Sequence, residues 1–245
     1  MKYGEIYELG RHKLMCGDAT SRDDVMRLVD GVKVDLVLTD PPYGIRSVNE
    51  HTRTIGGHHA SKLTAGKIIT ARQYAPVIGD KDTETAQKNY EIVKNVSKKS
   101  VIWGGQNFTG FLPPSCGWLY WDKDKNSEKI SFGDGELAWS NISTRIRKYV
   151  QKWNGFLREG DKSLNEKIHP NQKPVEIHMR ILEDFTQPDD VILDCFGGSG
   201  TTLIACEMTG RKCLMMEISP EYCDIITERY HKLMDGKLPL EVGNA

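Results

Sequence analysis

The sequence predicts an α/β fold with a doubly wound, mostly parallel sheet. The clearest evidence is the last third, where apolar strand-like runs and helical patterns alternate as strand, helix, strand, helix. A second observation is the continuous apolar run VDLVLT at 34–39, which is typical of a strand buried on both faces. The third is a glycine-rich turn at 196–200, placed between a predicted strand and a predicted helix.

The first half of the chain supplies the outer elements of this fold. Its opening residues predict a hairpin that turns at Gly10, and Ser21 is expected to cap a short helix over 21–30. The next regular helix is expected over 89–99, NYEIVKNVSKK. Further strands are predicted at 100–105, 117–121 and 136–140, and their tryptophans, Trp103, Trp118, Trp121 and Trp139, are expected in the core.

The last third predicts the cleanest elements. Apolar residues at helical spacing favour a helix over 175–185. A turn at 187–190 precedes a buried strand at 191–195, and the following helix should stop at Gly210. A strand at 212–217 then leads into a final helix, which Ser219 caps and Pro220 begins.

Composition excludes several classes of protein. The chain has 245 residues, of which 38% are hydrophobic and 27% charged, so it is neither fibrous, disordered nor a membrane protein by composition. No apolar run approaches the roughly 18 residues of a membrane span, and the N-terminus lacks a signal-peptide core. We therefore expect a cytoplasmic protein with no membrane partner. The net charge of -1 means that a nucleic acid would have to meet a local basic patch.

The six cysteines indicate no metal or redox centre. No two of them form a CxxC pair, and most stand in apolar stretches, so reduced core residues are expected. Residues 122–133 begin like a calcium loop but lack its glycine and its final glutamate. No metal is therefore expected.

The glycine-rich turn VILDCFGGSGTT favours a ligand. Glycines let the backbone turn tightly and let a ligand approach, and the helix start behind offers N–H groups. Glu217 ends the next strand, where an acid can accept hydrogen bonds from both ribose hydroxyls. The pattern is neither GxGxxG nor a P-loop, so an adenosine without phosphate fits better than NAD or ATP. A tight turn with no ligand is the alternative on these residues alone.

The tetrapeptide Asp40-Pro41-Pro42-Tyr43 ends the strand predicted at 34–39. Ligands of open α/β sheets bind at such strand ends. Two prolines remove two N–H donors, so the Asp40 carboxylate and the Pro41 carbonyl remain as acceptors beside the ring of Tyr43. An amino group on a flat ring, such as that of adenine, would match these groups, and a proline turn that merely closes a strand is the alternative.

Three motifs occur together and in order: TDPPYG at 39–44, HPNQKP at 169–174 and DCFGGSGTT at 194–202. With them the sequence resembles, over nearly its whole length, the β class of amino DNA methyltransferases, in which the catalytic half precedes the cofactor half. The opening YGEIYELGRHKLMCGD resembles methylase domains of phages and prophages. The resemblance implies a single Rossmann-like, S-adenosylmethionine-dependent methyltransferase domain over 1–245. Its implied parts are a catalytic half 1–140, a target-recognition segment 141–168, a cofactor-binding half 169–235 and a tail 236–245.

The resemblance also implies residue roles. The catalytic residues would be Asp40, Pro41, Pro42 and Tyr43. The glycine-rich turn would surround the methionine part of the cofactor, HPNQKP would close its end, Glu217 would hold the ribose and Asp18 would lie near the adenine. The family often has Thr where Asn171 stands. The implied cofactor-binding set is Asp18, Asn171, Gln172, Lys173, Asp194, Phe196, Gly197, Gly198, Gly200, Thr201 and Glu217.

The implied reaction transfers a methyl group from S-adenosylmethionine to adenine N6 of a base flipped out of double-stranded DNA, leaving S-adenosylhomocysteine. Hydrogen bonds from the amino group to Asp40 and to the Pro41 carbonyl would favour a localised lone pair on nitrogen, and Tyr43 would stack on the base. Double-stranded DNA is the implied partner. The resemblance leaves a homodimer and a cognate restriction endonuclease open.

Other reactions remain as alternatives. Cytosine N4 methylation uses the same chemistry, but its enzymes usually have Ser in place of Asp40, so Asp40 favours adenine. RNA or protein-amide methyltransferases often carry Asn there. A nicotinamide dehydrogenase would have GxGxxG and no DPPY, and a non-catalytic DNA-binding module would have a damaged motif. Cytosine C5 methylation needs a cysteine nucleophile, usually after proline, whereas Cys116 follows Ser115.

Two basic stretches are the candidates for DNA phosphate contact. Residues 44–79 carry five Lys or Arg against one acid, and residues 141–168 carry seven against three. A solvated loop is the alternative for any single residue. The residues expected to bind DNA are Arg46, Arg53, Arg72, Arg145, Arg147 and Lys148.

Overall fold

The computed structural model describes residues 1–45, 78–123, 133–151 and 172–236. Several predictions therefore lie outside the described residues. They concern most of the 44–79 loop, residues 152–168, the tail from 237 on, and the single residues Arg46, Arg53, Arg72 and Asn171.

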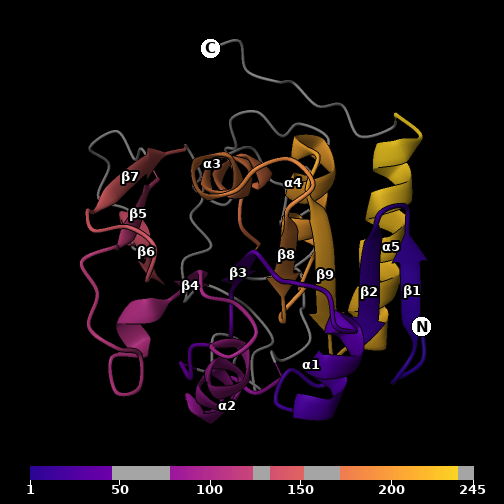
Figure 1. Ribbon diagram of the computed structural model, residues 1–245, viewed down its shortest axis with the longest axis horizontal. Coiled ribbons are helices and arrows are strands. Elements are labelled where there is room, and N and C mark those ends of the chain that lie inside the picture. The colour runs from indigo at the N-terminus through magenta and orange to yellow at the C-terminus, as the bar shows by residue number, and fades with distance from the viewer. Residues whose placement is uncertain (46–77, 124–132, 152–171, 237–245) are drawn as a thin grey trace, which may run out of the picture.

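The described strands form one sheet in the order β1-β2-β9-β8-β3-β4-β6-β5-β7 (Figure 1). The five strands from β2 to β4 in this order run parallel to their neighbours, as predicted. Antiparallel pairing joins β1 to β2 and places β6 against both β4 and β5. The strands are β1 Ile6–Leu9, β2 His12–Cys16, β3 Leu36–Thr39, β4 Ser100–Trp103, β5 Leu119–Asp122, β6 Gly135–Ser140, β7 Arg147–Val150, β8 Val191–Asp194 and β9 Lys212–Glu217.

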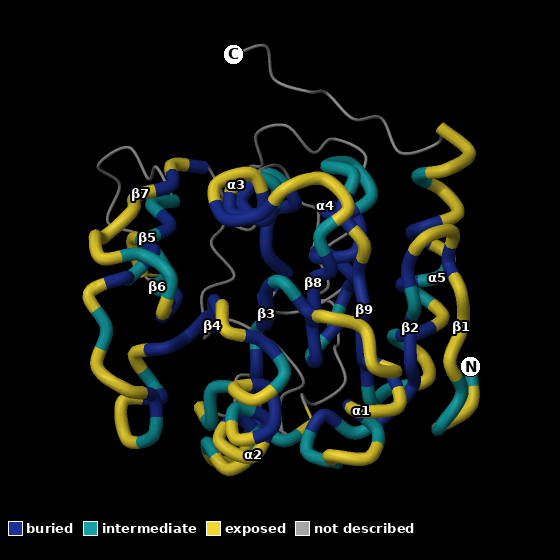
Figure 2. The backbone as a smooth tube through the Cα atoms, viewed as in Figure 1, coloured by how far each residue is buried: buried dark blue, intermediate teal, exposed yellow. Residues whose placement is uncertain are grey.

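Helices cover both faces of the sheet. Figure 1 shows α1 and α2 below it and α3 and α4 above it, and Figure 2 shows that the central strands between them are buried. The apolar core is divided accordingly, because one cluster joins the sheet to α3, α4 and α5 and another joins it to α1 and α2. The helices are α1 Arg22–Val29, α2 Glu84–Val93, α3 Val175–Phe185, α4 Thr201–Thr209 and α5 Pro220–Met234, with a 3-10 turn at Gly105–Asn107.

The chain leaves two neighbouring strands in opposite directions. β3 and β8 pair in parallel, with Leu36 opposite Ile192 and Val37 opposite Leu193. Among the described residues, the next helix after β3 is α2, on one face of the sheet, whereas β8 leads to α4 on the other face. Such a switch point opens a crevice at the carboxyl ends of the strands, where α/β proteins bind ligands. DPPY and the glycine-rich turn both begin there.

Local sequence accounts for where several elements begin and end. The Ser21 hydroxyl accepts a hydrogen bond from the Asp24 amide at 3.2 Å, and Ser219 caps α5 through the Tyr222 amide at 3.4 Å. Gly210 ends α4 with a φ of 74°, a conformation that costs glycine little. These three predicted signals are confirmed.

The predicted helix over 89–99 is wrong in its limits. The observed α2 begins at Glu84 and ends at Val93, because Ala86, Asn89 and Val93 form its buried stripe. Because the first turn of α2 is polar, the helical spacing of its buried residues is hard to recognise in the sequence. Beyond it, the Ser97 hydroxyl accepts a hydrogen bond from the Lys99 amide in a turn before β4, so the chain cannot continue as a helix there.

Smaller corrections concern the edge beyond β4. The strand β7 is not among the predicted strands; it lies within the basic stretch 141–168 and pairs in parallel with β5. Cys116 is exposed, unlike the other five cysteines, because it lies in the loop before β5. Trp118 precedes β5 and is only partly buried, whereas Trp103, Trp121 and Trp139 are buried as expected. No helix in the described part of the chain combines the length and apolarity needed to cross a membrane.

Candidate active site

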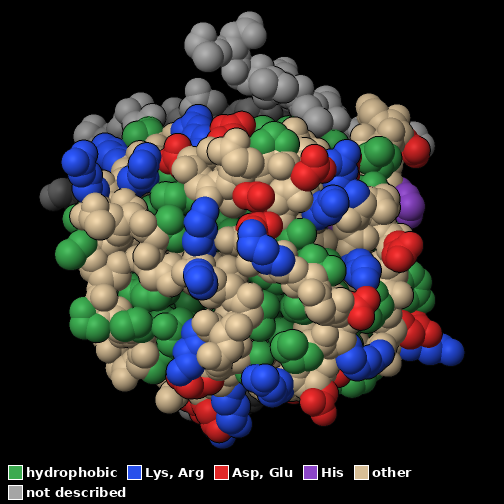
Figure 3. Space-filling model, in the orientation of Figure 1, with side chains coloured by type: hydrophobic (Ala, Val, Ile, Leu, Met, Phe, Trp, Pro, Cys, Tyr) green, Lys and Arg blue, Asp and Glu red, His purple; other side chains and the backbone are tan. Residues whose placement is uncertain are grey.

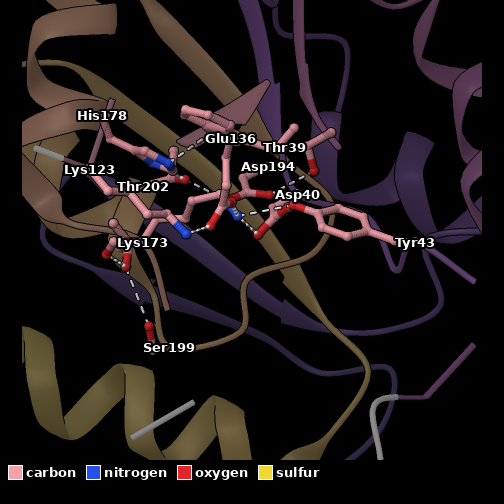
Figure 4. Close-up of polar contacts among 12 residues, drawn as sticks. Thr39, Asp40, Tyr43, Lys123, Glu136, Lys173, His178, Asp194, Ser199 and Thr202 are labelled. Atoms are coloured by element: carbon pink, nitrogen blue, oxygen red, sulfur yellow. Dashed lines mark hydrogen bonds and ion pairs between the residues drawn. The ribbon is translucent and has the colours of Figure 1, made fainter. Parts of the chain in front are cut away.

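Asp40 stands directly after β3, at the carboxyl edge of the sheet. Its Oδ1 accepts a hydrogen bond from the Tyr43 hydroxyl at 2.6 Å, and its Oδ2 accepts one from Lys173 Nζ at 2.7 Å (Figure 4). Pro41 and Pro42 are buried behind it. The rigid proline pair therefore presents the carboxylate at the crevice, with both of its oxygens engaged.

Lys173 is the cation at the centre of this site. Its side chain is only 4% exposed, and its three N–H donors meet Asp40, the Tyr43 hydroxyl at 3.1 Å and Glu136 Oε2 at 3.1 Å. The ring of Trp103 lies beneath the ammonium, with its centroid 5.2 Å away. Lys173 thus joins the DPPY tetrapeptide to the start of β6, and its ammonium lies against Asp40.

The charges of this cluster depend on one another. Burial would lower the pKa of Lys173, but the carboxylates of Asp40 and Glu136 outweigh it and hold that pKa well above its ordinary value. Burial raises the pKa of Asp40 against the opposing effect of Lys173. Burial would also raise the pKa of Glu136, yet Lys173 and Lys123 together lower it to about 2. Glu136 is therefore a fixed anion and a poor proton acceptor.

Tyr43 lies against a backbone that only glycine can provide. A Cβ added at Gly104 would lie 2.2 Å from Tyr43 Cε1, and Gly104 has a φ of 70°. The edge of the Phe108 ring closes another side, with ring centroids 6.1 Å apart. The turn after β4 therefore forms a wall for the aromatic ring of DPPY.

Asp194 ties the two motif-bearing strands together. Its Oδ1 accepts from the Thr39 hydroxyl at 2.8 Å and from the Phe196 amide at 3.1 Å, and its Oδ2 accepts from the Thr202 hydroxyl at 2.6 Å (Figure 4). Burial raises the pKa of Asp194 to about 7, in spite of these donors. Its position couples the start of DPPY to the glycine-rich turn.

A series of buried, hydrogen-bonded side chains leads from Asp194 toward Lys173. The indole N–H of Trp103 can only donate, so His178 Nε2 accepts it at 3.1 Å. The proton of the imidazole is then on Nδ1, which donates to the Thr202 hydroxyl at 3.1 Å. Burial, aided by Lys173, lowers the pKa of His178 to about 3, so the ring stays neutral.

The glycine-rich turn is held against the end of β9. Glu217 accepts hydrogen bonds from the Gly198 amide at 2.8 Å and from the Ser219 amide at 2.9 Å, one on each oxygen. β2 ends beside it, with Cys16 opposite Glu217, so the loop carrying Asp18 lies next to this carboxylate. Arg229 of α5 supports the turn from behind, donating to the Ser199 carbonyl at 2.8 Å.

The structure brings most of the predicted site residues to one crevice. DPPY, the Lys173 side chain, the glycine-rich turn, Glu217 and the Asp18 loop all lie at the carboxyl ends of β3, β8, β9 and β2. The Lys173 carbonyl also accepts from the Thr201 hydroxyl at 3.3 Å, which links HPNQKP to the start of α4.

Three of the predicted DNA-binding residues are among the described residues, and these three lie at a sheet edge. Arg145 is exposed just before β7. Arg147 pairs with Asp184 at 3.3 Å, and Lys148 pairs with Asp122 at 2.7 Å. These two cations are therefore already partnered within the chain.

Sequence reasoning missed several residues of the site. Glu136 carries a detectable signal, since it is an acid at the start of an otherwise apolar strand, ELAWS. Asp80 holds the backbone after DPPY by accepting a hydrogen bond from the Gly44 amide at 2.8 Å. The only sign of this role in the sequence is that Asp80 is an acid placed before a helix. His178 and Thr202 looked like ordinary helix residues. Among the described residues, no group of His, Cys, Asp and Glu could hold a metal ion.

Solved structures with the same fold carry the names of DNA methyltransferases or DNA modification methylases. The chain aligns with the PvuII DNA methyltransferase (cytosine-N4-specific) with a TM-score of 0.55 and 16% identity, covering 96% of this chain and 97% of that one. It also aligns with a DNA modification methylase of Thermus thermophilus, TTHA0409, solved in complex with S-adenosyl-L-methionine. That alignment has a TM-score of 0.53 and 20% identity, and it covers 96% of this chain and all of that one. At these identities the likeness shows the Rossmann-like methyltransferase fold, as predicted.

Sequence comparison shows the family. The chain is similar to Type II methyltransferase M2.MboI of Moraxella bovis, with 43% identity over an alignment 245 residues long. The alignment covers 86% of this chain and 85% of the relative. It is 39% identical over 146 residues to Type II methyltransferase M2.LlaDCHI of Lactococcus lactis subsp. cremoris, covering 60% of this chain and 53% of that protein. A family model described as DNA methylase matches residues 73–228. With more than half of its length matched, this chain belongs to the N6/N4 DNA methylase family.

Proposed function

We propose that this DNA methyltransferase transfers a methyl group from S-adenosylmethionine to adenine N6 of a flipped-out base. The observation that carries the proposal is Asp40: a carboxylate, rather than a hydroxyl or an amide, stands at the crevice between β3 and β8. Its pKa is raised by burial, which increases its strength as a hydrogen-bond acceptor for an amino group.

The residues around the glycine-rich turn fit the cofactor. Each oxygen of Glu217 receives one backbone N–H bond, and a carboxylate oxygen has room for a second donor, such as a ribose hydroxyl. Glu217 is also fixed in place by those two amides. When bound, S-adenosylmethionine supplies an electrophilic sulfonium methyl group. The residues that would hold it are Asp18, Gln172, Lys173, Asp194, Phe196, Gly197, Gly198, Gly200, Thr201 and Glu217, with Asn171 outside the described residues.

The catalytic tetrapeptide supplies two acceptors for one amino group. One N–H would bond to Asp40 and the other to the Pro41 carbonyl, which favours a nitrogen with a localised lone pair facing the methyl group. Catalysis then rests mainly on positioning the nitrogen and on the preorganised acceptors around it. The methylated nitrogen loses its proton readily, so Asp40 need not be a strong base.

Tyr43 supports the extruded base. Removing a base from the duplex costs a few kcal/mol, and stacking on an aromatic ring returns roughly 1–3 kcal/mol. Gly104 and Phe108 fix the plane of that ring. An aromatic residue held in this way suits a substrate that arrives as a single flat base.

The proposed DNA-facing edge is the end of the sheet at β7. Figure 3 shows Lys and Arg side chains gathered over this edge, where Arg145, Arg147 and Lys148 lie. Such a basic edge attracts phosphates. Arg145 is the strongest candidate of the three, because Arg147 and Lys148 already pair with carboxylates.

The biological setting stays a prediction. The names of the related Type II methyltransferases favour a role in restriction-modification, and hence a cognate restriction endonuclease. A homodimer, a cytoplasmic location and a division of the domain at 140 and 168 are further predictions from the sequence.

Nucleoside mass spectrometry tests the proposal. Unmethylated duplex DNA would be incubated with S-adenosylmethionine and the wild type, Asp40→Ala, or the control Asp23→Ala, which changes an exposed carboxylate on α1. Calorimetric titration with the cofactor would show that each variant is folded. We expect N6-methyladenine from the wild type and from Asp23→Ala, and none from Asp40→Ala.

Other outcomes would revise or reject the proposal. N4-methylcytosine would overturn adenine as the target while keeping the role of Asp40. Full activity of Asp40→Ala would contradict the assigned site. Cofactor binding without any modified base would point to RNA or protein as the substrate.

A further inference from the structure

The Tyr43 hydroxyl makes two contacts of opposite kind. It donates a hydrogen bond to Asp40 Oδ1 at 2.6 Å and accepts one from Lys173 Nζ at 3.1 Å. Asp40 and Lys173 are themselves 2.7 Å apart. The crevice therefore presents an acceptor beside a donor, and in this structure a group that is both donor and acceptor fills the place between them (Figure 4).

An adenine edge offers the same pair of functions. Its amino N–H is a donor, and the adjacent ring nitrogen N1 is an acceptor; cytosine offers N4–H beside N3 in the same way. We propose that Asp40 and Lys173 read this edge together, Asp40 accepting from the amino N–H and Lys173 Nζ donating to the adjacent ring nitrogen. Until the base arrives, the Tyr43 hydroxyl occupies the hydrogen-bonding positions on both Asp40 and Lys173. This inference rests on the proposed methylation of an amino group.

The pairing discriminates among bases. On its Watson–Crick edge, guanine has N1–H beside its amino group, so two donors would face one acceptor and one ammonium. Thymine has no amino group at all. A site built to hydrogen-bond one pattern rejects another strongly, because the wrong base leaves buried polar groups unpaired. Because the Lys173 side chain is almost fully buried, a base that offers its ammonium no acceptor incurs that penalty.

Lys173 can play this part because its charge is balanced. A lone cation at the ring nitrogen would draw electrons away from the amino nitrogen and oppose methylation. Here the ammonium lies between two carboxylates, Asp40 and Glu136, so its own charge is balanced, and Lys123 balances the second carboxylate. With the ammonium balanced, the Asp40 carboxylate that accepts from the amino group can favour the positive charge that develops on the methylated nitrogen. Glu136 is in turn held by Lys123 at 2.6 Å and is a positioning residue for Lys173.

Base analogues test the contact in the wild-type protein. Duplexes carrying the site mapped from the methylated product would contain adenine, 1-deazaadenine or, as the matched control, 7-deazaadenine at the target position. With saturating DNA and cofactor, single-turnover methylation of 1-deazaadenine should be about 10- to 100-fold slower than that of adenine, the effect of losing a hydrogen bond from a charged donor. The 7-deaza control should react like adenine. If the product is N4-methylcytosine, 3-deazacytosine replaces 1-deazaadenine.

The other effects of removing N1 would raise the methylation rate, which is opposite to the expected result. Loss of N1 weakens base pairing, which eases flipping, and makes the amino group more electron-rich. Both would speed the reaction, so a slower rate reports the missing contact. Lys173→Met should methylate adenine and 1-deazaadenine at equal rates, since the donor is gone.

Glu136→Gln tests the positioning role and does not depend on the folding of Lys173→Met. Burial raises the pKa of Asp40 most and the charge of Glu136 adds to it, so we expect removal of that charge to shift the acid limb of the single-turnover rate to lower pH. Glu207→Gln removes a comparably buried carboxylate, 20% exposed against 28%, far from the site, and should leave the acid limb unchanged. A merely structural role for Glu136 would lower the amount of folded protein without moving the pH profile.

The outcomes separate the two proposals. If the wild type leaves unmodified DNA unmethylated, the proposed function fails. If it methylates adenine and 1-deazaadenine equally fast, the function stands and the reading of the ring nitrogen by Lys173 is overturned. An unshifted pH profile in Glu136→Gln would overturn the role given to Glu136.

Discussion

Asp40 reaches its working environment through residues from distant parts of the chain. Tyr43 is three residues away, but Lys173 is 133 residues away and Glu136 belongs to another strand. The DPPY motif and its acceptors could be predicted from sequence because they are contiguous. The ammonium beside Asp40 could not, because nothing in HPNQKP shows toward which of the two motifs its lysine points.

The first prediction at this scale concerns Tyr43. Tyr43→Phe keeps the ring and removes only the hydroxyl that occupies Asp40, so single-turnover methylation should stay within about threefold of the wild type. Tyr43→Ala loses the stacking surface and should fall by about 10- to 100-fold. Measured single-turnover rates that are equal for the Phe and Ala variants would contradict a stacking role.

The second prediction concerns His178 and acid stability. Its pKa is lowered from 6.5 in the unfolded chain to about 3 in the fold, so below pH 6.5 the unfolded state binds the extra proton. The stability that neutral His178 contributes is complete above pH 6.5 and is lost as pH falls toward 3, at roughly 1.4 kcal/mol per pH unit.

Urea unfolding at pH 7 and pH 5 checks this sign. His178→Asn keeps an acceptor for Trp103 and has no proton to gain, so its stability should fall less between the two pH values than that of the wild type. The same loss in both proteins would show that His178 is not the acid-sensitive group.

At the scale of elements, three turns meet where β3, β4 and β8 end. DPPY follows β3, Gly104 follows β4 and the glycine-rich turn follows β8, and each turn is specified by its own residues. Helices with a regular apolar period, such as α3, could be predicted to the residue. The limits of α2 could not, because its buried stripe includes a polar asparagine, Asn89, which donates to the Ala19 carbonyl at 2.9 Å.

The turn after β4 gives the third prediction. Gly104→Ala must accommodate a positive φ and displace the Tyr43 ring, whereas Gly4→Ala, with a φ of 84° and open space around it, incurs only the backbone strain. Both variants should lose about 1–2 kcal/mol of stability from that strain. Only Gly104→Ala should also slow methylation, and equal single-turnover rates for the two variants would refute the wall that Gly104 provides for Tyr43.

At the scale of the whole molecule, the order of the strands creates the site. The reversal between β3 and β8 places the two motif-bearing turns side by side although 154 residues of chain separate Asp40 from Asp194. The parallel centre could be predicted from its apolar runs. The order β4-β6-β5-β7 could not, because short strands with partly exposed faces carry no sign of which neighbour they choose.

The basic edge at β7 gives the fourth prediction. Arg145→Glu should weaken DNA binding and reduce the slope of log affinity against log salt concentration by about 1, as expected for a lost phosphate contact. Lys232→Glu, on α5 at the opposite end of the sheet, is the control and should leave both quantities unchanged. Fluorescence anisotropy over a salt series would measure them, and identical slopes for Arg145→Glu and wild type would remove β7 from the DNA-facing surface.

The most direct test of the site is a single turnover with S-adenosylmethionine labelled in its methyl group, counting label in duplex DNA for the wild type and for Asp40→Asn. Asn keeps the size of Asp and one acceptor oxygen while removing the charge, and cofactor binding should be equal in the two proteins. We predict labelled DNA from the wild type and a rate about 100- to 1000-fold lower for Asp40→Asn. Equal rates, or a wild type that binds the cofactor and leaves DNA unlabelled, would contradict methyl transfer at Asp40.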